Sequence, residues 1–222
     1  MNPVTVSVNT LAWPSVSPDI LNSHVNVMRH LGIEVGYTLE QVPHGTWMDQ
    51  VLEHSETDIV CFLDVDCVFT NMDVFERCID FVATSKSFIG NAQVSNHIKP
   101  ASHIFAAPSF FMIWRETWKL MNKPSFQEMV RCDVGENVSY TAEMLGVRYK
   151  TLFPTHYCKA HENERWFLHT WGETGIGTLY EGGVFHLFQG RKPQNQELFK
   201  KVCDDIVSGV FSTQGMLPCH EI

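Results

Sequence analysis

The segment "DIVCFLDVD", residues 58–66, decides how this chain folds. Residues 59–63 are all apolar, which is typical of a strand buried on both faces, as in a parallel sheet. Asp64 and Asp66 stand at the end of this run. Because aspartate is uncommon in strands and costly to bury without a partner, two acids at this place indicate a cation or a reaction that uses them.

The residues before this segment predict two β-α units. A strand is expected over residues 4–9, a helix over 18–31, a second strand over 34–42 and a second helix from residue 46. Buried strands separated by helices of this length favour a mostly parallel sheet with right-handed crossovers. Since ligands bind beyond the carboxyl ends of the strands in such sheets, the two aspartates fall where a ligand is expected.

The second half of the chain is less regular. The pattern predicts a helix over 71–84, a loop over 96–109 between strand regions, a helix that ends at Gly146, and a closing amphipathic helix over 195–210. The sequence has no internal repeat and no linker rich in glycine or serine. We therefore expect one doubly wound, Rossmann-like α/β domain over residues 1–222, with a mostly parallel central sheet.

The composition narrows the class of protein. With 44% hydrophobic and 18% charged residues, the 222-residue chain is expected to be globular. Its formal charge of −9 argues against a nucleic-acid partner, which needs a basic surface. No run of about 18 apolar residues and no signal-peptide pattern occurs, so no membrane span is expected. Seven cysteines without paired metal-finger spacing suit free thiols and a cytoplasmic location.

Asp64 and Asp66 suit a divalent cation. At the end of a strand the turn can splay two carboxylates, spaced i and i+2, around one ion. Mg²⁺ or Mn²⁺ prefers such oxygen ligands and would bridge them to a diphosphate, whose developing negative charge it would neutralise. The pair therefore predicts a metal site that serves a diphosphate.

The stretch "ETDIVCFLDVDCVF", with the preceding helix "TWMDQVLEHS", resembles the Asp-X-Asp segment of GT-A nucleotide-sugar glycosyltransferases. The resemblance implies a GT-A-like fold in which residues 1–90 bind the nucleotide and metal, while residues 91–222 form the acceptor half and a closing C-terminal segment. It also implies donor contacts at Asn9 and Thr10, for which turn capping is the alternative. Trp13 would either stack on a base or cover the loop.

The stretch "GGVFHLFQGR" resembles the late GT-A segment in which a histidine completes the metal site. The resemblance implies that His186 joins Asp64 and Asp66 as a ligand of Mn²⁺ or Mg²⁺. The Gly190–Lys192 segment, with Arg191 in its centre, would then contact the donor diphosphate. The alternative is that His186 is an ordinary polar residue of a strand.

The stretch "CDVGENVSY" resembles the place where inverting GT-A enzymes carry the general base for the acceptor hydroxyl. Asp133 and Glu136 are the two candidates, with Glu136 preferred. The alternative is that Asp133 caps a helix and Glu136 is its capping-box partner. The sequence departs from the Glu-Asp dipeptide common in inverting families, which leaves the base and the stereochemistry open. Nearby, His97, Lys99 and His103 fall in the loop over 96–109, where a solvated loop is favoured over an acceptor contact.

The resemblance implies a metal-dependent glycosyltransferase that moves a sugar from a UDP or GDP donor to a glycan or other hydroxyl acceptor. A phosphatase of the haloacid-dehalogenase type is disfavoured because two β-α units precede the aspartates and because Asp204 and Asp205 fall on a helix. A nucleotidyltransferase usually has a glycine-rich basic loop after its first strand, which "NTLAWPSVSP" lacks. A non-catalytic sugar-binding module would have no use for the aspartates together with His186.

Overall fold

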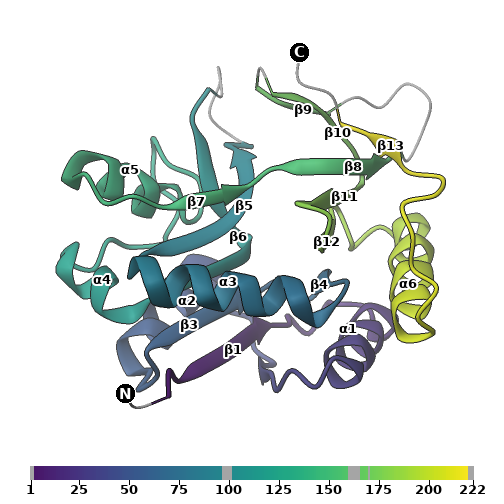
Figure 1. Ribbon diagram of the computed structural model, residues 1–222, viewed down its shortest axis with the longest axis horizontal. Helices are drawn as coiled ribbons and strands as arrows, with labels where there is room; N and C mark the ends of the chain where they lie inside the picture. The colour runs from purple at the N-terminus through teal and green to yellow at the C-terminus, as the bar shows by residue number, and fades with distance from the viewer. Residues whose placement is uncertain (1–2, 97–101, 160–165, 170, 220–222) are drawn as a thin grey trace.

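A computed structural model describes residues 3–96, 102–159, 166–169 and 171–219 (Figure 1). The helices are α1 (Pro18–His30), α2 (His44–His54), α3 (Met72–Ser85), α4 (Arg115–Leu120), α5 (Glu136–Leu145) and α6 (Pro193–Val207). The strands of the larger sheet are β1 (Val6–Leu11), β2 (Gly36–Thr38), β3 (Ile59–Leu63), β5 (Phe88–Val94), β6 (Ile104–Trp114) and β7 (Lys150–Leu152). The other strands are β4 (Cys67–Phe69), β8 (Pro154–Cys158), β9 (Trp166–Leu168), β10 (Gly172–Thr174), β11 (Gly177–Tyr180), β12 (Val184–Leu187) and β13 (Leu217–Pro218).

The larger sheet has six strands in the order β2-β1-β3-β6-β5-β7. Strand β6 runs antiparallel to both of its neighbours, and every other pair in this sheet is parallel. The prediction of an α/β fold with a mostly parallel central sheet is therefore confirmed. Strand β3, which carries the apolar run of the opening segment, lies inside this sheet between β1 and β6.

Helices pack on both faces of this sheet, as the fully apolar β3 requires. Ile59, Cys61 and Leu63 face a core that includes the apolar side of α3. Val60 and Phe62 face a second core formed with α2, α4 and α5. Because residues of a strand alternate between faces, a run that is buried on both sides must be apolar at every position.

A second, five-stranded sheet was not predicted from the sequence. Its order is β13-β8-β11-β12-β4, and all its pairs are antiparallel. Directly after the aspartates, β4 joins this sheet and pairs with β12, so that Cys67 lies opposite His186. Helices α1 and α6 pack side by side against it, around a third core (Figure 1). The Asp64–Asp66 turn is thus the crossing from the first sheet to the second.

The helix predictions agree best with the structure. Ser17 caps α1 and Asn71 caps α3 through side-chain hydrogen bonds, and α5 ends at Gly146 in the left-handed region, where glycine is favoured. The strand predicted over 34–42 is shorter, because only Gly36–Thr38 pairs with β1.

The loop predicted over 96–109 is wrong in its second half. Residues 104–108 begin β6, and residues 104–107 pair with β5. His97 and Lys99 lie outside the described residues.

Candidate metal and nucleotide site

The aspartates lie in a turn whose backbone is tied to both sheets. The Asp64 amide donates to the carbonyl of Ser109 in β6 at 2.9 Å, and the Leu187 amide of β12 donates to the carbonyl of Asp66 at 2.9 Å. The Cys67 amide donates to the Asp64 carbonyl across the turn at 2.9 Å. These bonds hold the two carboxylates at the edge where the sheets meet.

Asp64, Asp66 and His186 come together in three dimensions. One ligand atom from each lies within 4.8 Å of the others, and among the described residues they are the one group of acidic, histidine or cysteine side chains with this geometry. Nε2 of His186 is 3.7 Å from Oδ1 of Asp66. Two carboxylates and an imidazole are a donor set that Mn²⁺ accepts, so these residues fit a divalent cation.

Burial prepares these groups for a cation. It raises the pKa of both carboxyls above the usual range of aspartate, and the charge of Asp64 raises the pKa of Asp66 further. The amide of Gly190 and the guanidinium of Arg191 oppose this rise at Asp66. A bound cation would supply the positive charge that this pair of acids lacks.

His186 has the electronic state of a metal ligand. The residue is 6% exposed, and burial lowers its pKa to about 3, so its imidazole is neutral near pH 7. Its Nδ1 is buried and has no hydrogen-bond partner in the described part of the chain. A neutral imidazole keeps a lone pair, which ligation requires.

Gly190 and Arg191 close one side of the site. A Cβ atom at residue 190 would lie 2.6 Å from Oδ2 of Asp66, so only glycine lets the backbone come this close. The guanidinium of Arg191 lies over the indole ring of Trp13, 4.5 Å from its centroid. The indole Nε1 donates to the carbonyl of Val42 at 2.9 Å, which fixes the ring.

A cavity adjoins the two aspartates. It measures about 170 Å³, and its walls come from the β1-α1 loop, the start of α2, the aspartate turn and the segment before α6. Its lining residues are Leu11, Trp13, Val16, Ser17, Ile20, His44, Asp64, Val65, Asp66, Gly190 and Arg191. An apolar wall beside two carboxylates and a guanidinium suits a ligand with a flat apolar part and an anionic part.

His44 is a member of this site that the sequence analysis missed. Its Nε2 is 3.4 Å from Oδ1 of Asp64, and its side chain is 22% exposed. Burial lowers the pKa of His44 to about 4, so it is neutral near pH 7. The motif "HGTW" indicates only a helix start, and the sequence gives no other signal for this contact.

The other predicted donor contacts lie apart from the cavity walls. Thr10 is fully buried, and the side-chain Nδ2 of Asn9 donates to the Cys61 carbonyl at 3.3 Å. Lys192 is exposed and caps the start of α6. None of the three is among the described residues that line the cavity, so their roles toward a donor stay predictions.

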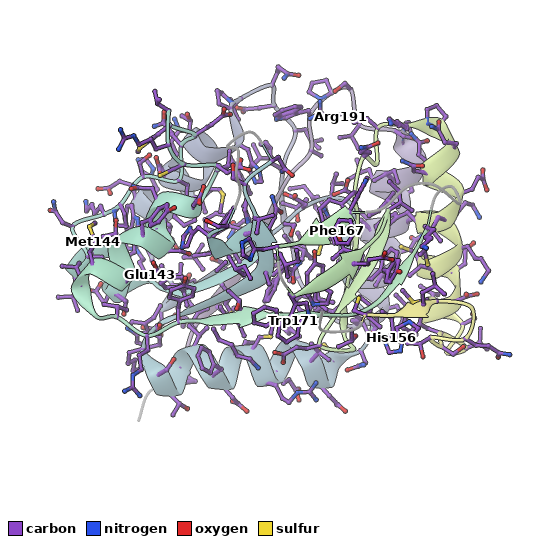
Figure 2. All side chains as sticks on the ribbon, turned by 90° about the horizontal axis from the view of Figure 1, so that it is seen from above. Glu143, Met144, His156, Phe167, Trp171 and Arg191 are labelled. Carbon is purple, nitrogen blue, oxygen red and sulfur yellow. The ribbon has the colours of Figure 1, made fainter. Side chains whose placement is uncertain are left out.

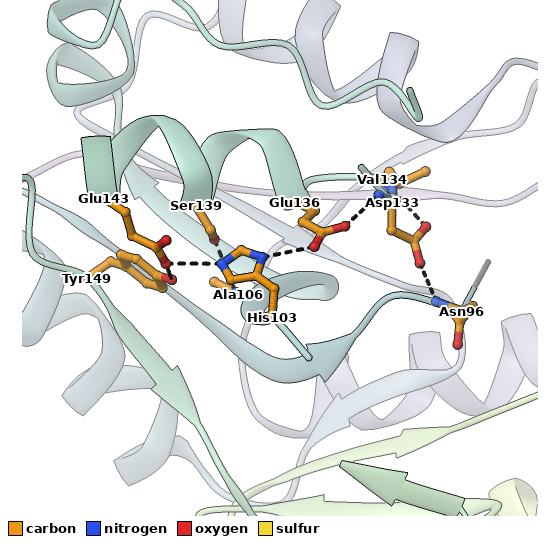
Figure 3. A network of polar contacts seen from close by, with 9 residues as sticks. All are labelled: Asn96, His103, Ala106, Asp133, Val134, Glu136, Ser139, Glu143 and Tyr149. Atoms are coloured by element: carbon orange, nitrogen blue, oxygen red, sulfur yellow. Dashed lines mark hydrogen bonds and ion pairs between the residues drawn. The ribbon is translucent and has the colours of Figure 1, made fainter. Parts of the chain in front are cut away.

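Asp133 and Glu136 lie in a separate network at the start of α5 (Figure 3). The carboxylate of Glu136 accepts from the Asp133 amide at 2.8 Å and contacts Nδ1 of His103 at 2.8 Å. The carboxylate of Asp133 accepts from the amides of Asn96 and Val134, at 2.9 and 2.8 Å. Both residues are buried, at 5% and 2% exposure for Asp133 and Glu136.

The capping alternative for this pair is partly right. Glu136 bonds back to the amide three residues earlier, as in a capping box. The N-cap of α5, however, is Gly135 in the left-handed region, not Asp133. His103 is not in a solvated loop, because it stacks on Tyr140 with ring centroids 3.9 Å apart and contacts the carboxylate of Glu143 at 3.1 Å.

The sequence matches no protein-family profile and no curated protein. Several solved structures are similar to it. A197 from STIV is 16% identical, with 82% of this chain and 93% of that chain covered and a TM-score of 0.47. A mannosyltransferase from Pyrobaculum calidifontis, in complex with GDP-Man and Mn²⁺, is 12% identical, with 68% and 55% covered and a TM-score of 0.47. A 4-diphosphocytidyl-2C-methyl-D-erythritol synthase from Anaerococcus prevotii is 11% identical, with 68% and 89% covered and a TM-score of 0.45.

No helix within the described ranges is long and apolar enough to cross a membrane.

Proposed function

We propose that this chain is a metal-dependent glycosyltransferase that moves a sugar from a UDP or GDP donor to a hydroxyl acceptor. The observation that carries the proposal is the convergence of Asp64, Asp66 and His186 within 4.8 Å beside a cavity with an apolar wall. Mn²⁺ or Mg²⁺ held by these three side chains would neutralise the diphosphate leaving group. The apolar wall would take the nucleoside part of the donor.

Arg191 has two tasks in this proposal. In the described structure its guanidinium lies over Trp13 and lines a cavity of about 170 Å³, which is below the roughly 300–1,000 Å³ of typical ligand pockets. A nucleotide that enters would displace it from the indole. The released guanidinium lies close enough to Asp66 to influence its pKa, so it can reach a diphosphate bound at the same place.

For the acceptor, Glu136 is the proposed base and Asp133 its alternative. Every oxygen of the two carboxylates accepts or contacts a donor in the network of Figure 3, so an acceptor hydroxyl would have to replace one of these partners. The contact with His103 involves a side chain, whereas the Asp133, Val134 and Asn96 contacts come from backbone amides. Glu136→Gln and Asp133→Asn each remove a charge and keep the shape. The general base is the residue whose variant loses sugar transfer but unfolds at the same temperature as the wild type.

The phosphatase alternative finds no support in the placement of its acids. Asp204 and Asp205 lie on α6 and pair with Lys200 and Lys201 at 2.8 and 2.6 Å, as surface i, i+4 pairs. They are not among the lining residues of the cavity. The acid pair that such a phosphatase would add to Asp64 and Asp66 is therefore engaged elsewhere.

The proposed function is tested by thermal unfolding with UDP, GDP or buffer alone, each with Mn²⁺ or with a chelator. A ligand at 100 times its dissociation constant stabilises the folded state by about 2.7 kcal/mol. We expect one nucleotide to raise the unfolding temperature only when Mn²⁺ is present. No rise with either nucleotide, in protein that folds normally, would contradict the proposal.

A further inference from the structure

His44 is held in a fixed place beside the metal ligands. It opens α2, and the next residue, Gly45, is packed so closely that a Cβ atom would lie 2.5 Å from the carbonyl oxygen of Phe126. The imidazole lies against the indole of Trp47, with ring centroids 5.7 Å apart and planes tilted by 31°. Trp47 is itself held by a hydrogen bond of 3.0 Å from its Nε1 to Oγ1 of Thr38.

The imidazole of His44 faces one carboxylate and not the other. Its Nε2 lies 3.4 Å from Oδ1 of Asp64, and His44 is among the residues that line the cavity. Asp66, in contrast, already accepts a hydrogen bond from the backbone amide of Gly190 and is attracted by the positive charge of Arg191. Of the two carboxylates, Asp64 is thus the one with the His44 imidazole as its neighbour.

We propose that His44 is a positioning residue, which orients the carboxylate of Asp64 toward the bound cation by donating from Nε2. The inference rests on the proposed function, because it requires a cation at Asp64, Asp66 and His186. A donor behind a carboxylate ligand restricts its rotation, so less freedom is lost when the cation binds. His44 itself contacts neither the reacting atoms nor the cation in this account.

The test is a titration of the protein with Mn²⁺ alone, in which binding is measured by calorimetry or by the electron paramagnetic resonance signal of the free ion. His44→Ala should weaken Mn²⁺ binding by about tenfold or more, as the removal of such supporting partners typically does. His44→Gln, whose amide nitrogen can take the place of Nε2, should restore most of that loss. A role of His44 limited to helix packing would not give this rescue.

Two controls make the outcome decisive. His54→Ala removes an exposed histidine from the last turn of the same helix, whose Nδ1 contacts the carbonyl of Gln50, and it should bind Mn²⁺ as the wild type does. Asp66→Ala should abolish binding at this site. If the wild type binds Mn²⁺ and Asp66→Ala does not, while His44→Ala binds as tightly as the wild type, the positioning role is wrong and the metal site stands.

Two further outcomes would also count against the inference. If His44→Ala binds Mn²⁺ normally but binds Mn²⁺ with UDP or GDP more weakly, His44 contacts the nucleotide donor and does not position Asp64. If the wild type and Asp66→Ala bind Mn²⁺ equally, the metal site is wrong and the inference is overturned with it.

Discussion

Two groups of acidic side chains in this molecule differ in how their charge is compensated. Around α5, Asp133 and Glu136 have a donor or an imidazole at every carboxylate oxygen. At the crossing between the sheets, Asp64 and Asp66 face each other and a neutral imidazole, and burial raises the pKa of both. Donors of the chain itself compensate the first group, whereas a cation bound at the second would relieve the repulsion between its two acids.

Figure 2 shows Glu143, in the last turn of α5, and Arg191 of the cavity on different sides of the molecule. The comparison teaches that burial of a carboxylate does not by itself indicate a site. What distinguishes Asp64 and Asp66 is that two half-buried acids lie side by side with raised pKa values, an arrangement that folding alone does not favour.

Asp66→Ala should abolish sugar transfer, with a loss of at least about 1,000-fold, because the cation that stabilises the leaving group loses a central ligand. Its unfolding temperature in chelator should equal or exceed that of the wild type, since one of two half-buried acids that repel each other is removed. Transfer and thermal unfolding measure the two effects. Asp80→Ala, an exposed acid of α3, is the control. Full activity in Asp66→Ala would end the metal-site assignment.

Arg191→Ala should weaken binding of the Mn²⁺–nucleotide by about 10- to 100-fold, because charge-assisted hydrogen bonds to the diphosphate are lost. Binding of Mn²⁺ alone should change far less. Calorimetry with UDP or GDP measures the difference, and Lys200→Ala, a cation in a surface pair on α6, is the control. Equal nucleotide affinity in Arg191→Ala and the wild type would remove Arg191 from the donor site.

Glu136→Ala should destabilise the fold by about 1–3 kcal/mol, because the buried amide of Asp133 loses its acceptor and His103 loses one of its two carboxylate partners. Urea unfolding measures this free energy. The exposed Glu76 of α3 provides the control Glu76→Ala, which should cost little. If both variants lower the free energy of unfolding by the same amount, the contacts of Glu136 around α5 do not stabilise the fold.

Rising pH should lower the stability of the metal-free protein and raise its affinity for Mn²⁺. Since burial raises the pKa of Asp64 and Asp66 in the folded state, that state binds protons more tightly than the unfolded chain does. The metal-free protein should therefore lose stability from this pair as pH rises above about 4, the usual pKa of aspartate. Mn²⁺ competes with the same protons, so its affinity should rise with pH. Unfolding in chelator and Mn²⁺ titration across pH measure both trends, and a metal affinity independent of pH would contradict them.

The sequence predicts the parallel half of the fold because its signals are local. The apolar run over 59–63, the Ser17 and Asn71 caps and the stop at Gly146 all act within a few residues of where they stand. The second sheet could not be predicted in this way. Its pairing of β4 with β12 joins segments more than 100 residues apart, and a three-residue strand carries too little pattern to be identified.

The site residues, too, fall into those that local sequence signals predict and those that only the fold brings together. Asp64 and Asp66 stand out because acids after a buried run conflict with local strand preferences. His186 was predicted only through resemblance, since its place beside them depends on the pairing of β4 and β12. His44 and the apolar walls contributed by Leu11, Val16 and Ile20 are ordinary residues of a strand, a loop and helix starts, and only the fold brings them to one cavity.

The most direct test of the central claim is a crystal structure of the protein with Mn²⁺ and UDP or GDP, in which anomalous scattering locates the manganese. We expect a manganese peak coordinated by Asp64, Asp66 and His186, with the diphosphate completing the shell. Manganese bound elsewhere, with these three side chains free of metal, would contradict it.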